Sequence, residues 1–293
     1  MNLIIFLLIF AISYKCIEGK VSSATNYNIS DVELHQLSEA FFSEHSDKLF
    51  KLLNVNYQGK TTNKNLTDNA PNPLFNFPPH IFTHPTISAL LKLYDNYLID
   101  ARQAEIKTDE EVVEENDFLD ILINQTVVLK AMDFLADKGF FIKSLNEYLI
   151  ILKQVWFQIY SRGKGIYGSS GFEHVFLMEK KKGSKLIGLH NWIFFAKQEL
   201  SNKINYLGLI KNKTFYNKLE IAHVHLKYEG KHKTSSMFIG TPPEFEIAVY
   251  TLCFFARPQN TCKLSFGGKK FYVQTYNWID KNYKLVGAAF PLI

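Results

Sequence analysis

The sequence has no long block of Lys or Arg, no internal repeat of fixed period and no apolar segment long enough to span a bilayer. Without a basic block, the net charge of +5, from 33 Lys and Arg against 28 Asp and Glu, is only a weak indication of a polyanionic partner. Without a membrane-length segment, we expect no stable membrane association. The 293 residues are 47% apolar and 15% aromatic, which excludes a disordered chain or a small scaffold and predicts a substantial core.

The chain begins with an apolar run of ten residues, Leu3–Ile12, which lies where the apolar part of a secretory signal peptide belongs. No Lys or Arg precedes the run and no Ala-x-Ala follows it, so only an approximate cleavage point near Gly19 is indicated. We predict a signal peptide over residues 1–19 and a secreted mature chain. The alternative is an N-terminal core segment.

Cysteine is scarce, because the sequence has three, and Cys16 would leave with the signal peptide. Cys253 and Cys262 remain, nine positions apart, and an even number of thiols in an oxidising compartment predicts a disulfide between them. Two buried thiols are the alternative, since spacing does not show that the two Cα atoms approach closely enough. Glycosylation sequons also fit secretion; they begin at Asn28, Asn65, Asn124 and Asn212.

Apolar residues have mostly helical spacing from about residue 30 to residue 162. Thr108–Glu111 and Ser144–Glu147 each have the pattern of a capping box and predict helix starts, the second helix ending near Arg162. The polar segment Asn56–Pro79 predicts a long surface loop.

Short β-branched and aromatic runs separated by Gly replace this pattern in the second half of the chain. The predicted strands are residues 173–180, 185–192, 219–228, 246–256, 263–266, 271–278 and 285–292. Because these strands cluster and do not alternate with helices, we predict an α+β fold. One domain over residues 20–293 would have a helical lobe, about 30–162, and a β-rich lobe with antiparallel sheets, about 163–293.

Two histidines come together if the first two of these strands form a hairpin. A three-residue loop ending at Gly183 would place Glu179 opposite Lys185 and His174 opposite His190. Facing Cβ atoms lie about 4.5–5.5 Å apart, so the two imidazoles could flank one small reacting group as general acid and base. Two unrelated, half-buried histidines are the alternative.

Metal binding is a rival interpretation. His223 and His225 share one face of a predicted strand, but no Cys or closely spaced carboxylate completes a tetrahedral set. A metal-dependent hydrolase using His223 and His225 is therefore kept as an alternative to solvent-facing strand histidines.

The next segment, Gly230–Gly240, is typical of a basic, hydroxyl-rich turn.

Several motifs, in order along the chain, resemble the EndoU (XendoU-type) endoribonucleases, which prefer uridylates. The motifs are Gly171–Phe176, Gly188–Trp192, Gly230-x-x-Lys233, Phe238–Glu246, Leu252–Pro258 and Thr275–Trp278. The resemblance is dense from about Ser161 to the end and looser in the helical half. It implies an EndoU-like fold and a uridylate-specific endoribonuclease.

The resemblance implies that His174, His190 and Lys233 are the catalytic residues. Lys231 is a close neighbour, but Lys233 keeps the Gly-x-x-Lys spacing of the family. One imidazole would remove the proton of a ribose 2′-hydroxyl and the other would protonate the departing 5′-oxygen. Lys233 would stabilise the charge that gathers on the phosphorus centre, and the products would be a 2′,3′-cyclic phosphate and a 5′-hydroxyl.

Substrate contacts are predicted at Thr275, Tyr276 and Asn191, where Tyr276 could stack on a uracil. Glu173 and Glu179 lie on family carboxylate positions, and the resemblance implies stimulation by Mn²⁺, which favours oxygen ligands. A pair between Glu179 and the lysine across the predicted hairpin is the alternative.

The expected partner is single-stranded, uridine-rich RNA, bound by a monomer. The alternative from another functional class is a secreted RNA- or polyanion-binding protein of the same fold that does not rely on cleavage.

Overall fold

The computed structural model describes residues 28–293, so the predicted signal peptide (1–19) and Cys16 lie outside the described residues. The helices are α1 (Asp31–Glu44), α2 (Lys48–Leu52), η1 (Pro79–Thr83), α3 (Pro85–Lys92), α4 (Asp109–Ile123), α5 (Thr126–Asp137), α6 (Leu145–Phe157), α7 (Gly171–Phe176), η2 (Lys182–Ser184), α8 (Trp192–Leu200) and α9 (Pro243–Ala256). The strands are β1 (Asn54–Val55), β2 (Phe75–Asn76), β3 (Met178–Lys181), β4 (Lys185–Gly188), β5 (Ile204–Phe215), β6 (Leu219–Tyr228), β7 (Lys231–Ile239), β8 (Thr261–Phe266), β9 (Lys269–Asp280) and β10 (Tyr283–Leu292).

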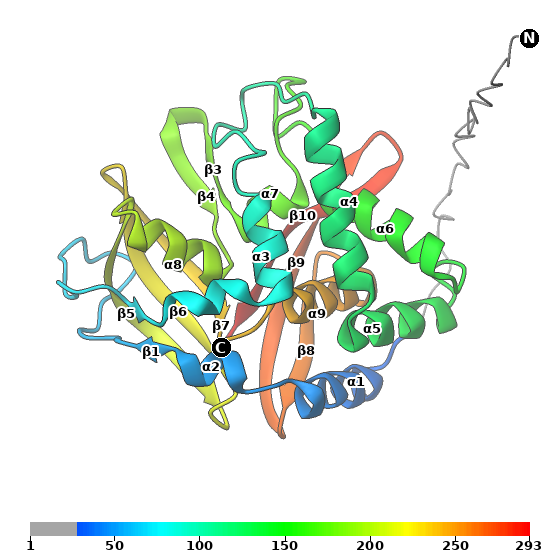
Figure 1. The fold of residues 1–293 in the computed structure, drawn as a ribbon, viewed down its shortest axis with the longest axis horizontal. Coiled ribbons are helices and arrows are strands. Elements are labelled where there is room, and N and C mark those ends of the chain that lie inside the picture. Colours follow the sequence, from blue (N-terminus) through cyan, green and yellow to red (C-terminus); the bar gives the residue numbers. More distant parts are fainter. Residues whose placement is uncertain (1–27) are drawn as a thin grey trace, which may run out of the picture.

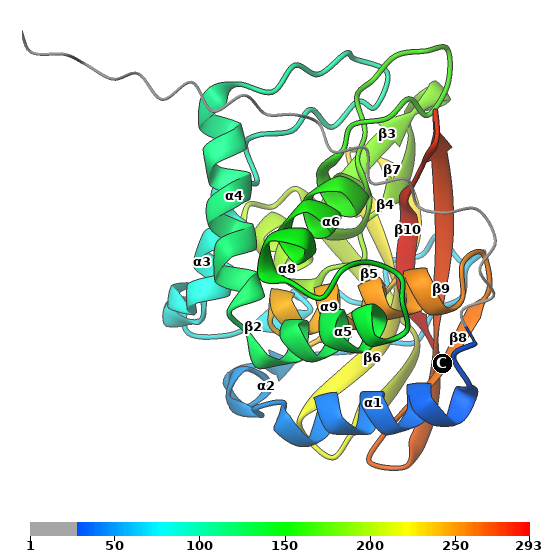
Figure 2. The same ribbon diagram turned by 90° about the vertical axis from the view of Figure 1, so that its right-hand side faces the viewer.

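Two three-stranded antiparallel sheets form the C-terminal half, with strand orders β5–β6–β7 and β10–β9–β8. Helices α3 to α6 gather beside these sheets, α1 lies along β8, and α9 packs between α5 and β9 (Figures 1 and 2). Strand β7 of the first sheet contacts both β4 and β10, so the two sheets meet there. The predicted α+β fold, helical first and β-rich second, is confirmed.

The predicted caps begin two of the helices. Thr108 accepts the N–H of Glu111 at 3.2 Å, and the Glu111 carboxylate accepts the N–H of Thr108 at 2.6 Å, which completes the capping box of α4. Ser144 accepts the N–H of Glu147 at 3.2 Å at the start of α6. Helix α6 ends at Phe157, about one turn before the predicted end, because the next residue has extended backbone angles.

Three segments of the β-rich half differ from the prediction. The predicted strand 246–256 is part of α9, whose residues are buried on nearly all sides, so its apolar run shows no helical period. The predicted strand 185–192 changes into helix α8 after four strand residues. The predicted turn Gly230–Gly240 is mostly strand β7, and β5 was not predicted.

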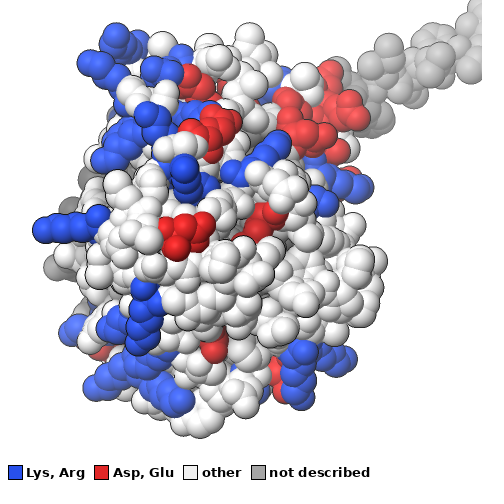
Figure 3. Space-filling model, turned by 90° about the vertical axis from the view of Figure 1, so that its left-hand side faces the viewer, with Lys and Arg blue, Asp and Glu red and all other residues white. Residues whose placement is uncertain are grey.

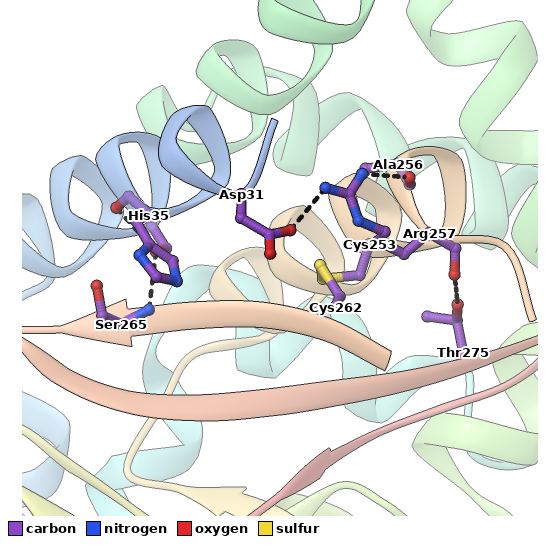
Figure 4. Close-up of a disulfide and its surroundings, with 9 residues drawn as sticks. Asp31, His35, Cys253, Ala256, Arg257, Cys262, Ser265 and Thr275 are labelled. Atoms are coloured by element: carbon purple, nitrogen blue, oxygen red, sulfur yellow. Dashed lines mark hydrogen bonds and ion pairs between the residues drawn. A yellow bond between two sulfur atoms is a disulfide. The ribbon is translucent and has the colours of Figure 1, made fainter. Parts of the chain in front are cut away.

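The predicted disulfide is present between Cys253 of α9 and Cys262 of β8, whose Cα atoms are 5.5 Å apart (Figure 4). Next to it, Arg257 pairs with Asp31 of α1 at 2.8 Å.

The apolar core is continuous through both halves of the chain, so the helical and β-rich parts are held as one body. Among residues 28–293, no helix has the length and apolar content needed to cross a membrane.

Candidate active site

The β3–β4 hairpin has a different register from the predicted one. Glu179 pairs with Ile187 and not with Lys185, because the turn is formed by residues 182–184 and not by residues 181–183. The predicted cross-strand pair of Glu179 with Lys185 is therefore wrong.

The predicted strand 173–180 is also wrong at its beginning, where His174 lies in the short helix α7. Ser170 begins this helix by accepting the N–H of Glu173 at 3.2 Å, and the strand starts only at Met178. His174 therefore cannot face His190 as a strand partner.

His174 and His190 nevertheless lie together, because the chain returns from β4 along the end of α7. The N–H of Leu189 donates to the carbonyl of His174 at 3.0 Å, and the N–H of His190 donates to the carbonyl of Val175 at 2.8 Å. The two ring centroids are 6.0 Å apart and the ring planes are inclined by 45°. Each histidine is 8% exposed, so both rings are enclosed but still reach the surface.

Gly188 makes this close return possible. Its φ is +73°, and a Cβ at this position would lie 2.1 Å from the carbonyl oxygen of His174. We expect Gly188→Ala to destabilise the protein by more than about 1 kcal/mol and to separate the two histidines. Thermal unfolding and the RNA cleavage expected from the family resemblance should both report the loss.

Gly183 provides the matched control for this substitution. It lies in the same hairpin with a φ of +75°, but a Cβ there would meet nothing within 4 Å. Gly183→Ala should therefore destabilise the protein only through the backbone strain and leave the expected RNA cleavage nearly unchanged. Equal effects of the two substitutions would contradict the role assigned to the Gly188–His174 contact.

Glu179 orients His174. Its carboxylate lies 2.6 Å from Nδ1 of His174 and 3.3 Å from Nε of Arg162. Burial lowers the pKa of His174 to about 4; the charge of Arg162 adds to this effect and Glu179 opposes it. Burial alone would raise the pKa of Glu179, but the hydrogen bond to His174 and the charge of Arg162 outweigh burial and lower it. Glu179 is therefore an anion that holds the His174 ring and favours its protonated form.

His190 has a different environment. Its Nδ1 lies 3.0 Å from the carbonyl oxygen of Ser236 on β7, and its ring stacks on Phe290 of β10 with centroids 4.7 Å apart. Because a carbonyl oxygen only accepts, the hydrogen-bond network assigns the proton of the neutral ring to Nδ1 and leaves a lone pair on Nε2. Burial, followed by the charge of Lys233, lowers the pKa of His190 well below its usual value.

Lys233 supplies positive charge beside both imidazoles. It lies half-buried on β7, and its Nζ is 3.4 Å from the carbonyl oxygen of Thr234. Within the described residues it has no carboxylate partner. Burial, followed by the charge of Lys185, lowers the pKa of Lys233 to about 8, so it is mostly charged at neutral pH.

Tyr276 and Thr275 are neighbours on β9 but point in opposite directions, as consecutive strand residues do. Tyr276 is 47% exposed and its ring lies 6.3 Å from that of Phe290, which places it in a row with Phe290 and His190. Thr275 is fully buried, and its hydroxyl donates to the carbonyl of Arg257 at 3.2 Å (Figure 4). Of these two side chains, only that of Tyr276 is placed to contact a base.

Asn191, also predicted to contact substrate, is an interior residue. It is fully buried, its Oδ1 accepts the N–H of Phe194 at 3.0 Å as the cap of α8, and its Nδ2 lies 3.2 Å from Glu246. The side chain therefore supports the segment that follows His190 from within the protein interior.

Comparisons with known proteins identify the family of this chain. The family model described as endoribonuclease XendoU matches residues 33–291. The chain belongs to the XendoU endoribonuclease family.

Relatives in this XendoU family match over most of their length. Uridylate-specific endoribonuclease D of Xenopus laevis is 36% identical over 275 residues, which cover 90% of each chain. Uridylate-specific endoribonuclease EndoU of Drosophila melanogaster is 33% identical, over 87% of this chain and 81% of its own. The solved structure of XendoU, described as a splicing-independent snoRNA-processing endoribonuclease, superposes with a TM-score of 0.70 at 29% identity, over 88% of this chain and 97% of its own.

The two carboxylates proposed for Mn²⁺ from the XendoU resemblance have different surroundings. Glu173 is buried, and neither of its carboxylate oxygens has a hydrogen-bond partner among the described residues. Burial, followed by the charges of Glu105 and Glu179, raises the pKa of Glu173 well above its usual value and so favours its neutral form. Glu179 is occupied by His174 and Arg162. In the described part of the chain no three His, Cys, Asp or Glu side chains are placed to hold a metal ion, so no step below uses one.

His223 and His225 likewise lack the partners that a metal-dependent hydrolase would need. The ring of His225 is buried, and its Nε2 lies 3.3 Å from Nδ1 of His232 on β7. No further His, Cys, Asp or Glu in residues 28–293 joins them in a possible metal site. The structure therefore gives this alternative no support.

Three contributors to the XendoU-family site were not identified as site residues from the sequence: Arg162, the carbonyl of Ser236 and the ring of Phe290. Arg162 and Glu179 are 17 positions apart, and His190 and Ser236 are 46 positions apart. No local pattern reports such contacts. The only signal was that Arg162 lies where the family resemblance becomes dense, from about Ser161 onward.

Proposed function

We propose that this protein is an endoribonuclease that cleaves single-stranded RNA at uridylates. The observation that carries the proposal is the cluster of His174, His190 and Lys233, in which two imidazoles 6.0 Å apart have different hydrogen-bond partners and share one neighbouring cation. The uridylate specificity named for the Xenopus and Drosophila relatives supports the choice of substrate.

His190 is the general base. Its Nδ1 is held by the carbonyl oxygen of Ser236, so Nε2 carries the lone pair that removes the 2′-hydroxyl proton. The lowered pKa of His190 keeps the ring neutral and ready to accept a proton at neutral pH.

His174 is the general acid. Burial holds its pKa at about 4 in the free protein, and Glu179 opposes this effect. An anionic phosphodiester beside the ring adds a second negative charge, which favours the imidazolium. The protonated ring then donates to the departing 5′-oxygen, and Glu179 balances its charge.

Lys233 and Tyr276 complete the reaction site. The Lys233 ammonium stabilises the negative charge that builds up on the non-bridging phosphate oxygens when the 2′-oxygen attacks. Tyr276, in the row with Phe290 and His190, offers an exposed ring on which the uracil can stack.

The charge distribution supports a polyanionic substrate better than the total of +5 does. Lys and Arg side chains gather along one margin of the face shown in Figure 3, whereas a group of Asp and Glu lies in the opposite upper corner. The β3–β4 turn contributes exposed lysines at positions 181, 182 and 185. Their charges would attract the RNA backbone toward the catalytic cluster.

The test uses an oligoribonucleotide with a single uridine. We expect cleavage after the uridine, with a 2′,3′-cyclic phosphate on one fragment and a 5′-hydroxyl on the other, because the 2′-oxygen is the nucleophile. The matched control carries 2′-deoxyuridine at that position and should stay intact. Cleavage of the control would overturn internal transfer, and binding of both oligonucleotides without cleavage would instead identify an RNA-binding protein. Parallel reactions with Mn²⁺ and with a chelator measure the stimulation that the resemblance implies.

We also propose that the protein is secreted, on the prediction of a signal peptide over residues 1–19. The Cys253–Cys262 disulfide and the exposure of the sequon residues Asn28, Asn124 and Asn212 support this. Expression in a secretory cell, followed by N-terminal sequencing of protein from the medium, tests it. Retention of the uncleaved chain inside the cell would overturn it.

A further inference from the structure

A cavity of about 240 Å³ lies next to His190. His190 and Phe290 form its wall toward the catalytic cluster, and strands β5, β6 and β7 form its floor with Lys211, His223 and Ser236. No acidic side chain lines it. Of these residues, His190, Phe290 and Ser236 belong to the site described above, whereas Lys211 and His223 do not.

The polar groups of this cavity form a single row across the sheet. Lys211 of β5 pairs with His223 of β6, and His223 pairs with Ser236 of β7. The row ends at His190, whose Nδ1 lies 3.0 Å from the carbonyl oxygen of Ser236. Neighbouring strands are about 4.8 Å apart, so His223 is about 10 Å from the backbone of His190, and Lys211 is one strand further. His223 and Lys211 therefore lie progressively farther from the expected position of the scissile phosphate than His190 does.

The two distal side chains are free to bind a ligand. Among the described residues, the ammonium of Lys211 has no ion-pair partner, and the half-buried ring of His223 makes no hydrogen bond. Burial is the largest cause of the lowered pKa of His223, and the charge of Lys233 is the second. The positive field of Lys233 therefore reaches this cavity. A cavity lined by a lysine and two imidazoles, and by no Asp or Glu side chain, favours an anion.

The cavity also lies away from the expected position of the uracil base. Tyr276 contacts Phe290 but does not line the cavity, whereas Leu292, two residues beyond Phe290 on β10, does. The uracil site and the cavity are therefore on opposite sides of Phe290. A volume of about 240 Å³ is below the range of about 300–1,000 Å³ typical of pockets for whole ligands, so the cavity fits only part of a nucleotide.

We propose that this cavity is a subsite for the phosphate of the nucleotide next to the scissile phosphate, with Lys211 as its ion-pair partner and His223 as a hydrogen-bond donor. The inference rests on the proposed ribonuclease activity and deepens it. Lys211 and His223 act in binding, and they do not take part in the proton transfers. Their contribution should therefore appear in KM, and only for substrates long enough to reach the cavity.

The experiment compares three minimal substrates: UpA, pUpA with an added 5′-phosphate, and UpAp with an added 3′-phosphate. In the wild-type protein, one added phosphate should lower KM by roughly 3- to 30-fold at unchanged kcat, as expected for a charge-assisted contact. The phosphate that does so identifies which neighbour of the scissile phosphate the cavity holds. Lys211→Ala should remove this gain and leave KM and kcat for UpA unchanged, and His223→Ala should reduce it.

Lys213→Ala is the matched control, since Lys213 lies on the same strand but donates to the carbonyl of Lys270 and does not line the cavity. It removes the same charge and should preserve the gain. The subsite is overturned if neither phosphate lowers KM, if Lys213→Ala has the same effect as Lys211→Ala, or if Lys211→Ala impairs UpA as much as the longer substrate.

Failure of the proposed function gives a different result. If the wild-type protein cleaves neither UpA nor a long uridine-rich RNA, the activity itself is refuted. In that case, binding of the same three compounds with 2′-deoxyuridine in place of uridine still tests the subsite. An affinity gain from one added phosphate that Lys211→Ala removes would support it, and its absence would overturn it.

Discussion

Replacing His174 with alanine is expected to lower kcat for cleavage at uridine by about 10²–10⁴-fold, the usual contribution of a general acid. The loss should depend on the leaving group, because His174, held by Glu179 at 2.6 Å, is the residue placed to protonate the departing 5′-oxygen. A substrate with 5′-sulfur in place of this oxygen releases a thiolate, which needs no protonation. We therefore expect His174→Ala to be much less impaired on the thio substrate than on ordinary RNA.

His190→Ala provides the comparison, since a general base is required whichever atom leaves. It should lose about 10²–10⁴-fold in kcat on both substrates. His80→Ala, at an exposed position on η1, should change neither rate and controls for the loss of an imidazole. If the 5′-thio substrate rescued His190→Ala in place of His174→Ala, the two roles would have to be exchanged. If it rescued neither variant, the assignment of a general acid to this pair would be wrong.

The contact between His174 and His190 could be predicted from the sequence, but its structural basis could not. Pairing of apolar and charged residues along residues 173–192 predicts a hairpin, and a hairpin is present. The pattern could not reveal that the first four of these residues complete a helical turn, because Ser170 caps a helix too short to show a period. The histidines meet through the backbone contacts of Leu189 and His190 with α7 and not through strand pairing.

Helix α9 shows a second limit of sequence patterns. Sequence reasoning distinguishes a helix from a strand by the period with which apolar residues alternate with polar ones. From Pro243 to Phe254 every residue of α9 is buried, so the apolar run has no polar face. A buried strand and a buried helix then have the same pattern, and only packing between α5 and the second sheet decides between them.

The residues proposed as catalytic could be selected from the sequence, but their surroundings could not. His174, His190 and Lys233 follow from motif order, whereas the proposed assignment of acid and base depends on a carboxylate beside one ring and a carbonyl beside the other. Asn191 lies within a motif that includes His190, and its side chain caps helix α8. Proximity in sequence to a catalytic residue therefore does not distinguish contact with substrate from support of the backbone.

The pH dependence of RNA binding is expected to report the charge of Lys233. Burial and the charge of Lys185 lower the pKa of Lys233 to about 8, so the lysine loses its proton as the pH rises through 8. Binding of an anionic phosphate then requires proton uptake, and affinity falls with rising pH. The probe is an oligonucleotide with 2′-deoxyuridine, which binds but is not cleaved. Lys233→Arg keeps its charge throughout this range, because a guanidinium has a pKa above about 12.

We expect the ratio of the affinity of Lys233→Arg to that of the wild-type protein to rise by about tenfold for each pH unit above 8. The reason is that binding to the wild-type protein takes up one proton in this range, whereas binding to Lys233→Arg takes up none. Titration of His174 is common to both proteins and cancels in this ratio. Lys185→Gln removes a like charge that lowers the pKa of Lys233, and it should move the wild-type decline to higher pH. Lys181→Gln, in the same hairpin, is the matched control and should leave the decline in place. A ratio that stays constant from pH 7 to pH 10 would show that the Lys233 charge does not contribute to phosphate binding.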